Sequence, residues 1–264
     1  MLRVRKRDGR LEEFSKAKIV RTCLRAGASK RVAEKVADEV ERRIYDGIST
    51  DEVLELVIEL LLKHEYPKAE RYDLKRSLIR LGPSGFGFEK FVARLLEEYG
   101  FKTETNVIVQ GKCVEQEIDV VAEKAGEKYM IECKFHNLPI YTGLKEAMYT
   151  YARFLDVEEH FTKPWIFTNT KFSDEAKRYA SCMGIKLTGW SYPENEGIEV
   201  LLESKSLYPI TILRIGKEVL DTVVKAGLIF CRDIVRAGES RLREVGLSRD
   251  EARRLIEEAK KVIS

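Results

Sequence analysis

The chain has 264 residues, of which 44% are hydrophobic and 34% are charged, with 47 Lys and Arg against 44 Asp and Glu. This length allows one large domain or two to three small ones, and the net charge of +3 excludes a protein that is basic over its whole surface. No apolar run is long enough to cross a membrane, and the basic first residues lack the apolar core of a signal peptide.

Residues 1–14 predict a hairpin of two short strands, LRVRKR and RLEEF, joined at Asp8 and Gly9. Asp-Gly favours a type I′ turn because both central residues need a positive φ. Four helices are expected next. Ser15 caps one that ends at Gly27, Ser29 caps one that ends near Gly47, a capping box of Ser49 and Glu52 opens 50–64, and Pro67 opens a fourth toward Leu81.

This ββαααα pattern resembles the ATP-cone, the nucleotide-binding regulatory module of ribonucleotide reductases and their repressors. The residues that carry the resemblance are VRKRDGRLEEF (4–14), KAKI (16–19), YDGISTDEV (45–53) and YDLKRSL (72–78). It implies binding of ATP or dATP by Val4, Lys6, Arg7, Lys18 and Thr50. Clustered cations suit a triphosphate, and a helix N-terminus offers free N–H groups. The alternative is that the basic residues are the solvated face of an exposed hairpin.

The segment Leu81–Gly87 contains three glycines and a proline, which marks a domain boundary. After it, Phe88–Tyr99 shows apolar residues at i, i+3, i+4, i+7 and i+8, the pattern of an amphipathic helix. Glu89 flanks that apolar stripe and is placed to reach a cleft. Its alternative role is that of a first-turn acid favoured by the helix dipole.

Gln116–Lys134 predicts a β-hairpin with its turn near Ala125 and Gly126. Side chains two apart on a strand share a face, so Glu132 and Lys134 point the same way. With Asp119 on the paired strand, two carboxylates and an amine meet at one edge of the sheet.

Such a trio suits a hydrolytic metal site, because Mg²⁺ binds through one or two carboxylates plus water and substrate phosphate. We expect Asp119 and Glu132 to hold Mg²⁺, or Mn²⁺ in its place, with the Cys133 carbonyl as a further ligand. Lys134 would orient the attacking water or neutralise transition-state charge. The alternative, solvated positions on a half-exposed hairpin, is disfavoured because these charges lie within apolar strands.

Gly87–Lys134 resembles the restriction-endonuclease-like fold, most closely its Mrr branch, through FEKFVARLLEEYGF, EIDVV and IECK. Archaeal Holliday-junction resolvases share this skeleton. The resemblance implies Mg²⁺-dependent cleavage of DNA with Glu89, Asp119, Glu132 and Lys134 at the catalytic positions. The helix after the lysine strand departs from the Mrr pattern: Glu146 and Tyr149 stand where many relatives have a glutamine-and-tyrosine motif.

The remaining elements alternate between helix and strand: a helix at 141–155, a strand at 164–170, a helix from Ser173 to Gly184 and a strand at 185–190. Alternation of this kind predicts a mixed α/β sheet covered by helices. Residues 207–264 predict a helical domain with short loops.

The stretch 242–263 resembles the second half of a helix-hairpin-helix, and 212–227 is a weaker copy. Such hairpins bind DNA phosphates through backbone N–H groups. The residues expected to contact DNA are Gly216, Lys217, Gly246, Ser248 and Arg249. The alternative is a SAM-like bundle that mediates protein contacts.

Together these patterns predict three domains, at 1–82, 83–206 and 207–264. The leading interpretation is a DNA endonuclease in which ATP is a regulatory ligand, because no GxxxxGK[ST] loop is present. Two alternatives are a non-catalytic DNA-binding regulator that responds to nucleotide, and a nuclease specific for branched DNA. A homodimer would supply two active sites for double-strand cutting.

The five scattered cysteines lack zinc spacing, so buried free thiols and a cytoplasmic location are expected.

Overall fold

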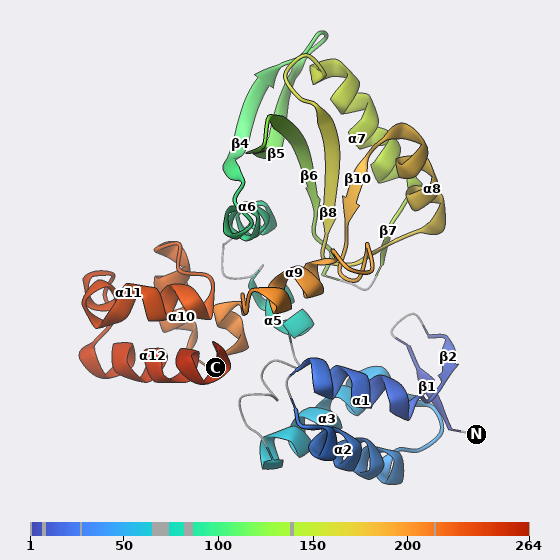
Figure 1. Cartoon of the computed structure of the whole chain (residues 1–264), viewed down its shortest axis with the longest axis vertical. Coiled ribbons are helices and arrows are strands. Elements are labelled where there is room, and N and C mark those ends of the chain that lie inside the picture. Colours follow the sequence, from blue (N-terminus) through green and yellow to red (C-terminus); the bar gives the residue numbers. More distant parts are fainter. Residues whose placement is uncertain are drawn as a thin grey trace. The chain divides into compact units, whose positions relative to one another are not determined.

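The computed structural model describes residues 2–6, 9–26, 28–64, 74–81, 87–137, 140–213 and 215–263. These residues form a mixed α/β structure, which confirms the predicted class (Figure 1). The chain divides into two compact units. One contains Met1–Ser77, Tyr208–Leu220 and Phe230–Ser264, and the other contains Leu78–Leu207 and Asp221–Ile229.

The N-terminal part begins with the predicted hairpin. Strand β1 (Arg3–Arg5) pairs antiparallel with β2 (Leu11–Glu13) and parallel with β3 (Ile48–Ser49), in the order β2-β1-β3. Gly9 has a φ of 85°, which agrees with the predicted turn, while Asp8 lies outside the described residues. The parallel pairing matters because it sets the ends of β1 and β3 beside each other, where α3 begins.

The helices of this part start at the predicted caps. The Ser15 and Ser29 hydroxyls accept the N–H groups of Lys18 and Val32, and Ser49 and Glu52 form the capping box. The helices are α1 (Lys16–Arg25), α2 (Lys30–Arg43), α3 (Thr50–His64) and α5 (Leu74–Leu81). Helix α2 ends before the predicted Gly47 because Ile44 is already extended and the chain turns into β3. The start of the fourth helix, predicted at Pro67, lies outside the described residues.

The larger unit is built on a five-stranded sheet with the order β10-β8-β6-β5-β4. Its antiparallel half is a meander, and β8 and β10 add to it in parallel. The strands are β4 (Lys102–Gln110), β5 (Glu115–Lys124), β6 (Glu127–Lys134), β8 (Lys163–Thr168) and β10 (Lys186–Thr188). The sequence did not predict β4, an edge strand in which exposed residues alternate with half-buried ones.

Helices cover both faces of this sheet, with α6 on one side and α7 and α8 on the other (Figure 1). Their bounds are α6 (Phe88–Glu98), α7 (Leu144–Val157) and α8 (Asp174–Met183). Residues 141 and 142, predicted as helix, form the short strand β7 (Tyr141–Thr142) paired with β9 (Lys171–Phe172). Helix α9 (Ile198–Ser204) follows the sheet.

The C-terminal residues are helical, as predicted. A short 3₁₀ turn (Ile210–Ile212) precedes α10 (Lys217–Lys225), α11 (Cys231–Glu244) and α12 (Arg249–Ile263). Gly238, with φ 68° and ψ 179°, breaks α11 into two helical pieces. The chain here is therefore a series of short helices joined by tight turns.

All five cysteines are free thiols, as the sequence predicts. Cys23 and Cys231 are buried, but Cys113 and Cys182 are exposed, which corrects the expectation that all would be buried. Within the described ranges, none of the helices combines the length and apolarity that crossing a bilayer requires.

Candidate active site

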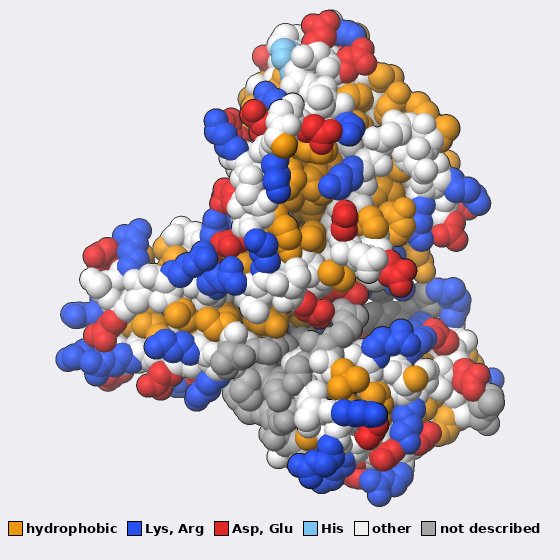
Figure 2. Space-filling view, in the orientation of Figure 1, with side chains coloured by type: hydrophobic (Ala, Val, Ile, Leu, Met, Phe, Trp, Pro, Cys, Tyr) orange, Lys and Arg blue, Asp and Glu red, His pale blue; other side chains and the backbone are white. Residues whose placement is uncertain are grey.

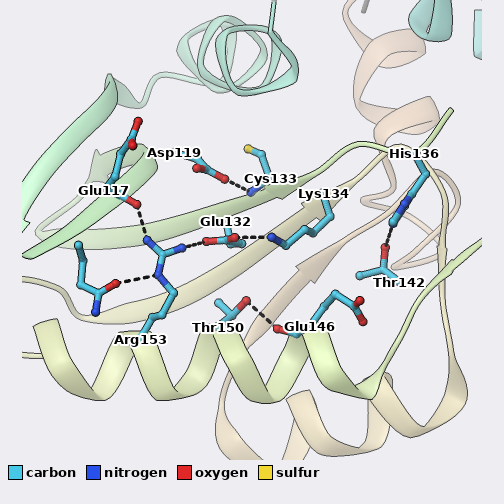
Figure 3. A network of polar contacts seen from close by, with 11 residues as sticks. Glu117, Asp119, Glu132, Cys133, Lys134, His136, Thr142, Glu146, Thr150 and Arg153 are labelled. Atoms are coloured by element: carbon cyan, nitrogen blue, oxygen red, sulfur yellow. Dashed lines mark hydrogen bonds and ion pairs between the residues drawn. The ribbon is translucent and has the colours of Figure 1, made fainter. Parts of the chain in front are cut away.

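The hairpin predicted from the sequence forms, and it brings the expected acids together. Ala125 and Gly126 both have positive φ, at 53° and 82°, so the turn fixes the register in which Val120 faces Ile131. The next position toward the open end of the hairpin has Asp119 on β5 and Glu132 on β6. Asp119 Oδ2 accepts the Cys133 N–H at 2.7 Å, so its carboxylate lies against the backbone between Glu132 and Lys134 (Figure 3).

Glu132 is the centre of a buried charge network. Its side chain is 5% exposed, Lys134 Nζ lies 2.6 Å from Oε1, and Arg153 of α7 donates to Oε2. Arg153 also donates to the Glu117 carbonyl and, at 3.0 Å, to Gln116 Oε1. Both carboxylate oxygens are therefore held by cations, which a buried charge requires.

Asp119 has a different environment from Glu132. Burial, together with the nearby negative charge of Glu132, raises the pKa of Asp119 to about 6, although the Cys133 N–H bond and the cations Lys134 and Arg153 oppose the rise. Asp119 therefore lies where additional positive charge would be stabilised, and a bound cation would favour its ionised form.

The donor set at this place fits a hard divalent cation. In a strand, the N–H and C=O of one residue point toward the same neighbouring strand. The Cys133 N–H points toward Asp119, so the Cys133 carbonyl points to that side too. A carboxylate, a backbone carbonyl and a second carboxylate across the hairpin are the oxygen ligands that Mg²⁺ prefers. The described residues contain no cluster of three or more His, Cys, Asp or Glu side chains arranged to hold a metal, so any ion here would rely on the carbonyl and water as well.

Glu89 lies at the edge of this site. It occupies the first turn of α6, and its carboxylate folds back over Gly87, where a side chain larger than that of glycine would clash with Glu89 Oε1. Glu89, Asp119 and Glu132 all contribute to raising the pKa of the Cys133 thiol, after burial itself. Glu89 is thus close enough to act electrostatically on β6, and its fold-back position matches the helix-dipole role that the sequence left open.

Helix α7 supplies the residues that sequence reasoning missed. Arg153 was not predicted, and Tyr149 was noted only as a departure from a family motif. The Tyr149 ring centroid lies 5.9 Å from Lys134 Nζ and 5.6 Å from Arg153 Cζ, within cation–π range. Glu146 accepts the Gly143 N–H at 2.9 Å, so it caps the helix. The sequence signal that could have identified Arg153 is its position on α7. It lies on the same helix face as Thr150 and Val157, which are buried.

His136 follows the lysine strand but does not reach the acids. Its Nε2 lies 3.1 Å from Thr142 Oγ1, and its backbone N–H and carbonyl bind the buried Asn169 side chain. Burial lowers the pKa of His136. His136 is therefore held in a structural position by Thr142 and Asn169.

In the N-terminal part, two of the predicted nucleotide-binding lysines converge. Lys6 and Lys18 both form ion pairs with Glu12, and together they lower its pKa to about 2. Thr50 is the first residue of α3, at the edge where β1 and β3 end side by side. Val4 is buried in the hydrophobic core, so it offers only backbone, and Arg7 lies outside the described residues.

In the C-terminal part, the predicted hairpin at 245–248 forms. Gly246 has a φ of 111°, and its N–H bonds to the Arg243 carbonyl. Ser248 caps α12, and its N–H bonds to Glu251 at 2.9 Å. Arg249 lies 3.2 Å from Glu239. Phosphate binding would therefore compete with these internal contacts.

The predicted weaker copy has a different geometry. Gly216 is not among the glycines with positive φ, and a 3₁₀ turn rather than an α-helix precedes it, with Lys217 beginning α10. The turn that repeats the Gly246 pattern is at Gly227, which has a φ of 78° and donates to the Val224 carbonyl. The structure thus does not give Gly216 and Lys217 the backbone shape of the second hairpin.

Three protein-family models match this chain. The restriction endonuclease model of the Mrr catalytic domain matches residues 82–190, where the acids and Lys134 lie. The ATP cone domain matches residues 2–78, and the AF1548-like C-terminal domain matches residues 208–263. The chain belongs to the Mrr-like restriction endonuclease family. The chain carries an N-terminal ATP cone, as its resemblance to ATP-cone proteins predicted, and an AF1548-like C-terminal domain, which was not predicted.

Relatives of this Mrr-like protein come from Archaeoglobus fulgidus. One uncharacterized protein is 80% identical over 173 residues, which are 65% of this chain and 99% of the relative. A second is 86% identical over 42 residues, 16% of this chain and 89% of the relative. The crystal structure of AF1548, a protein of unknown function, matches with a TM-score of 0.61 and 79% identity, over 66% of this chain and 96% of that one.

Proposed function

We propose that this Mrr-like protein is a Mg²⁺-dependent DNA endonuclease whose activity responds to ATP or dATP. The observation that supports it best is the contact of Asp119 with the backbone N–H between Glu132 and Lys134. Asp119, Glu132 and the Cys133 carbonyl would hold Mg²⁺ or Mn²⁺, which would activate water and stabilise charge on the phosphoryl oxygens.

The residues of the chain each have a task in this reaction. Lys134, which is 29% exposed, reaches solvent and would orient water and neutralise developing negative charge on the phosphate. Arg153 holds Glu132 in place from α7. Glu89, at the start of α6, would assist through the charge it adds beside β6.

Regulation would come from the ATP cone. Lys6, Arg7, Lys18 and the N-terminus of α3 at Thr50 would bind the triphosphate, and Val4 would contribute backbone contacts. Glu12 now holds both described lysines of this group, so a triphosphate would replace it as their partner.

The C-terminal domain would anchor the protein on DNA through the turn at Gly246, Ser248 and Arg249. We propose the three-domain division at 1–82, 83–206 and 207–264. Free thiols fit a reducing compartment, so we place the protein in the cytoplasm.

The test is a cleavage panel with the full chain on supercoiled, linear and four-way DNA, with Mg²⁺ and with or without ATP. Asp119→Asn removes a metal ligand, while Glu117→Gln changes an exposed acid on the same strand whose carbonyl still binds Arg153. We expect wild type and Glu117→Gln to cut and Asp119→Asn to be inactive. Equal cutting by Asp119→Asn would reject the assignment, and a preference for four-way DNA would redefine the substrate.

A further inference from the structure

Helix α7 has an apolar outer face in addition to the buried face that packs on the sheet. Leu144, Met148 and Leu155 are 36%, 50% and 42% exposed. At 100° per residue they fall within roughly 40° of one another around the helix, so they form one stripe. Figure 2 shows apolar side chains gathered on the part of the surface where α7 and α8 lie. We name this stripe, with the exposed Ala152 on its border, the α7 outer face.

The charges at the two ends of this face are of opposite sign. Lys145 is exposed near the start of α7, and Glu159 is exposed just beyond its end. Among the residues that the structure describes, neither forms an ion pair. Ala152, midway between them, has a side chain small enough to let a second helix approach closely. The face is thus apolar along its length and has a small side chain at its centre. It carries a positive charge at one end and a negative charge at the other.

A surface of this kind is complementary to itself when a second copy is turned through 180°. In an antiparallel pairing centred on Ala152, Met148 of one copy lies within one residue of the position opposite Leu155 of the other. The same register sets Lys145 opposite Glu159 of the other copy, twice per pair. We propose that the α7 outer face is a homodimer interface in which two α7 helices pack antiparallel about a two-fold axis at Ala152.

The size of the face sets the expected affinity. Helix α7 has 14 residues, so it is about 21 Å long. Two such helices, with the neighbouring exposed Tyr141, bury less than the roughly 1,200–2,000 Å² of a standard stable interface. We therefore expect a weak dimer that forms reversibly as concentration rises.

The pairing also has a consequence for cleavage, and this consequence alone rests on the proposed function. The inner face of α7 carries Arg153, which binds Glu132. Two-fold pairing through the outer face would relate two nuclease sites by a two-fold axis. The two strands of a DNA duplex have the same local symmetry, so each site would meet one strand.

The first experiment is sedimentation equilibrium of the full chain, without DNA or nucleotide, over a concentration range up to about 0.2 mM. Met148→Lys and Leu155→Lys place like charges in the middle of the stripe. Ile108→Lys is the matched control, because Ile108 is 69% exposed on β4, away from α7. We expect wild type and the control to dimerise equally and both α7 variants to dimerise at least tenfold more weakly. A wild-type monomer throughout, or dimers indifferent to the α7 variants, would overturn the interface.

The second experiment tests the antiparallel register. Lys145→Glu places two acids opposite each other and should weaken the dimer, and the added Glu159→Lys should restore it. Ala152→Cys, in a background with the exposed Cys113 and Cys182 changed to Ser, should form a disulfide with its own copy under oxidation. Failure of the charge swap to restore dimers, or no cross-link at position 152, would contradict the register. Nuclease activity is not measured in either experiment, so failure here leaves the proposed function untouched.

Discussion

The candidate nuclease site and the ATP cone each hold one glutamate between two cations, and the two arrangements differ in burial. Glu132 lies between Lys134 and Arg153 with its side chain 5% exposed. Glu12 lies between Lys6 and Lys18 with its side chain 41% exposed. The same charges therefore serve different ends: a buried group fixes geometry, while an exposed one can exchange partners at little cost.

Burial makes the Glu132 network hard to open. Removing Lys134 or Arg153 would leave the Glu132 carboxylate buried with only one cation, which would no longer offset the cost of its desolvation. This rigidity suits a catalytic centre, because ligands and cations must keep their positions when substrate arrives. Asp119, on the adjacent strand, has a pKa raised to about 6, so this centre still favours one more positive charge.

Exposure makes the Glu12 cluster easy to open. Water screens the ion pairs and solvates each lysine that is released. A triphosphate carries more charge than one carboxylate and would displace Glu12 from Lys6 and Lys18. The cations around the buried Glu132 are therefore expected to keep their positions, whereas those around the exposed Glu12 are expected to change partners.

The largest effect is expected at Lys134. Lys134→Met should lower the rate of DNA cleavage by about a hundred- to thousandfold, because a preorganised positive charge in the transition state is lost. Metal binding should persist, because Lys134 is not a ligand. Single-turnover cleavage and a Mn²⁺ titration on the same preparation measure the two properties. Loss of metal binding, or cleavage within a few-fold of wild type, would contradict this role.

The next effect concerns stability at Arg153. Arg153→Met should lower the free energy of unfolding by about 3 kcal/mol, because Glu132 remains buried with one partner fewer. The matched control is Lys163→Met, which removes an exposed pair with Glu127 and should cost far less, because solvent screens that pair. Urea denaturation measures both. Adding Glu132→Gln to Arg153→Met should recover part of the loss, and a further loss would show that Arg153 acts by packing instead.

The pH dependence of Asp119 gives a smaller effect. Its folded-state pKa is raised to about 6, so the stability linked to this group is present below pH 4 and is lost as pH rises through 6. Without metal, Asp119→Asn should therefore be more stable than wild type by about 1–2 kcal/mol at pH 7 and equal to it at pH 4. Thermal unfolding in chelator across this range measures the difference. If the stability difference between the two proteins does not change with pH, the pKa of Asp119 is not raised in the folded state.

The smallest effect is expected at Glu12. Glu12→Gln frees Lys6 and Lys18, so ATP should bind about threefold to fivefold more tightly, the scale of an exposed ion pair. Glu13→Gln, the next residue on the same strand, is the control and should leave the affinity unchanged. Isothermal titration of ATP into the full chain measures both. Weaker binding by Glu12→Gln would mean that Glu12 positions the lysines for nucleotide instead of competing with it.

Local sequence signals predicted most of the elements that position the site. Ala125 and Gly126 marked the turn that sets Asp119 against β6, and Ser49 with Glu52 marked the start of α3. These signals depend on neighbours within a few residues, so they can be recognised without knowledge of the fold. Strand β4 was missed because one side of it faces solvent, and Lys102, Thr103 and Glu104 dilute its apolar alternation.

The contacts made across the fold could not be read from local patterns. Arg153 meets Glu132 from 21 residues away, and only the packing of α7 on the sheet brings them together. The start of α7 at Leu144 was misplaced because Glu146 caps Gly143 after a short strand. Gly216 was predicted as a turn glycine because its flanking sequence resembled the motif. The turn with a positive φ is at Gly227 instead, because that backbone angle depends on where the preceding helix ends.

The most direct test is a titration of Mn²⁺ into the full chain without DNA, followed by electron paramagnetic resonance of the free ion. Wild type and Glu117→Gln should each bind one Mn²⁺ at the nuclease site, and Asp119→Asn should lose that site. Binding should weaken below pH 6, where protons compete for the Asp119 carboxylate. If wild type binds no Mn²⁺, or if Asp119→Asn binds it as tightly as wild type, Asp119 and Glu132 do not form a metal centre.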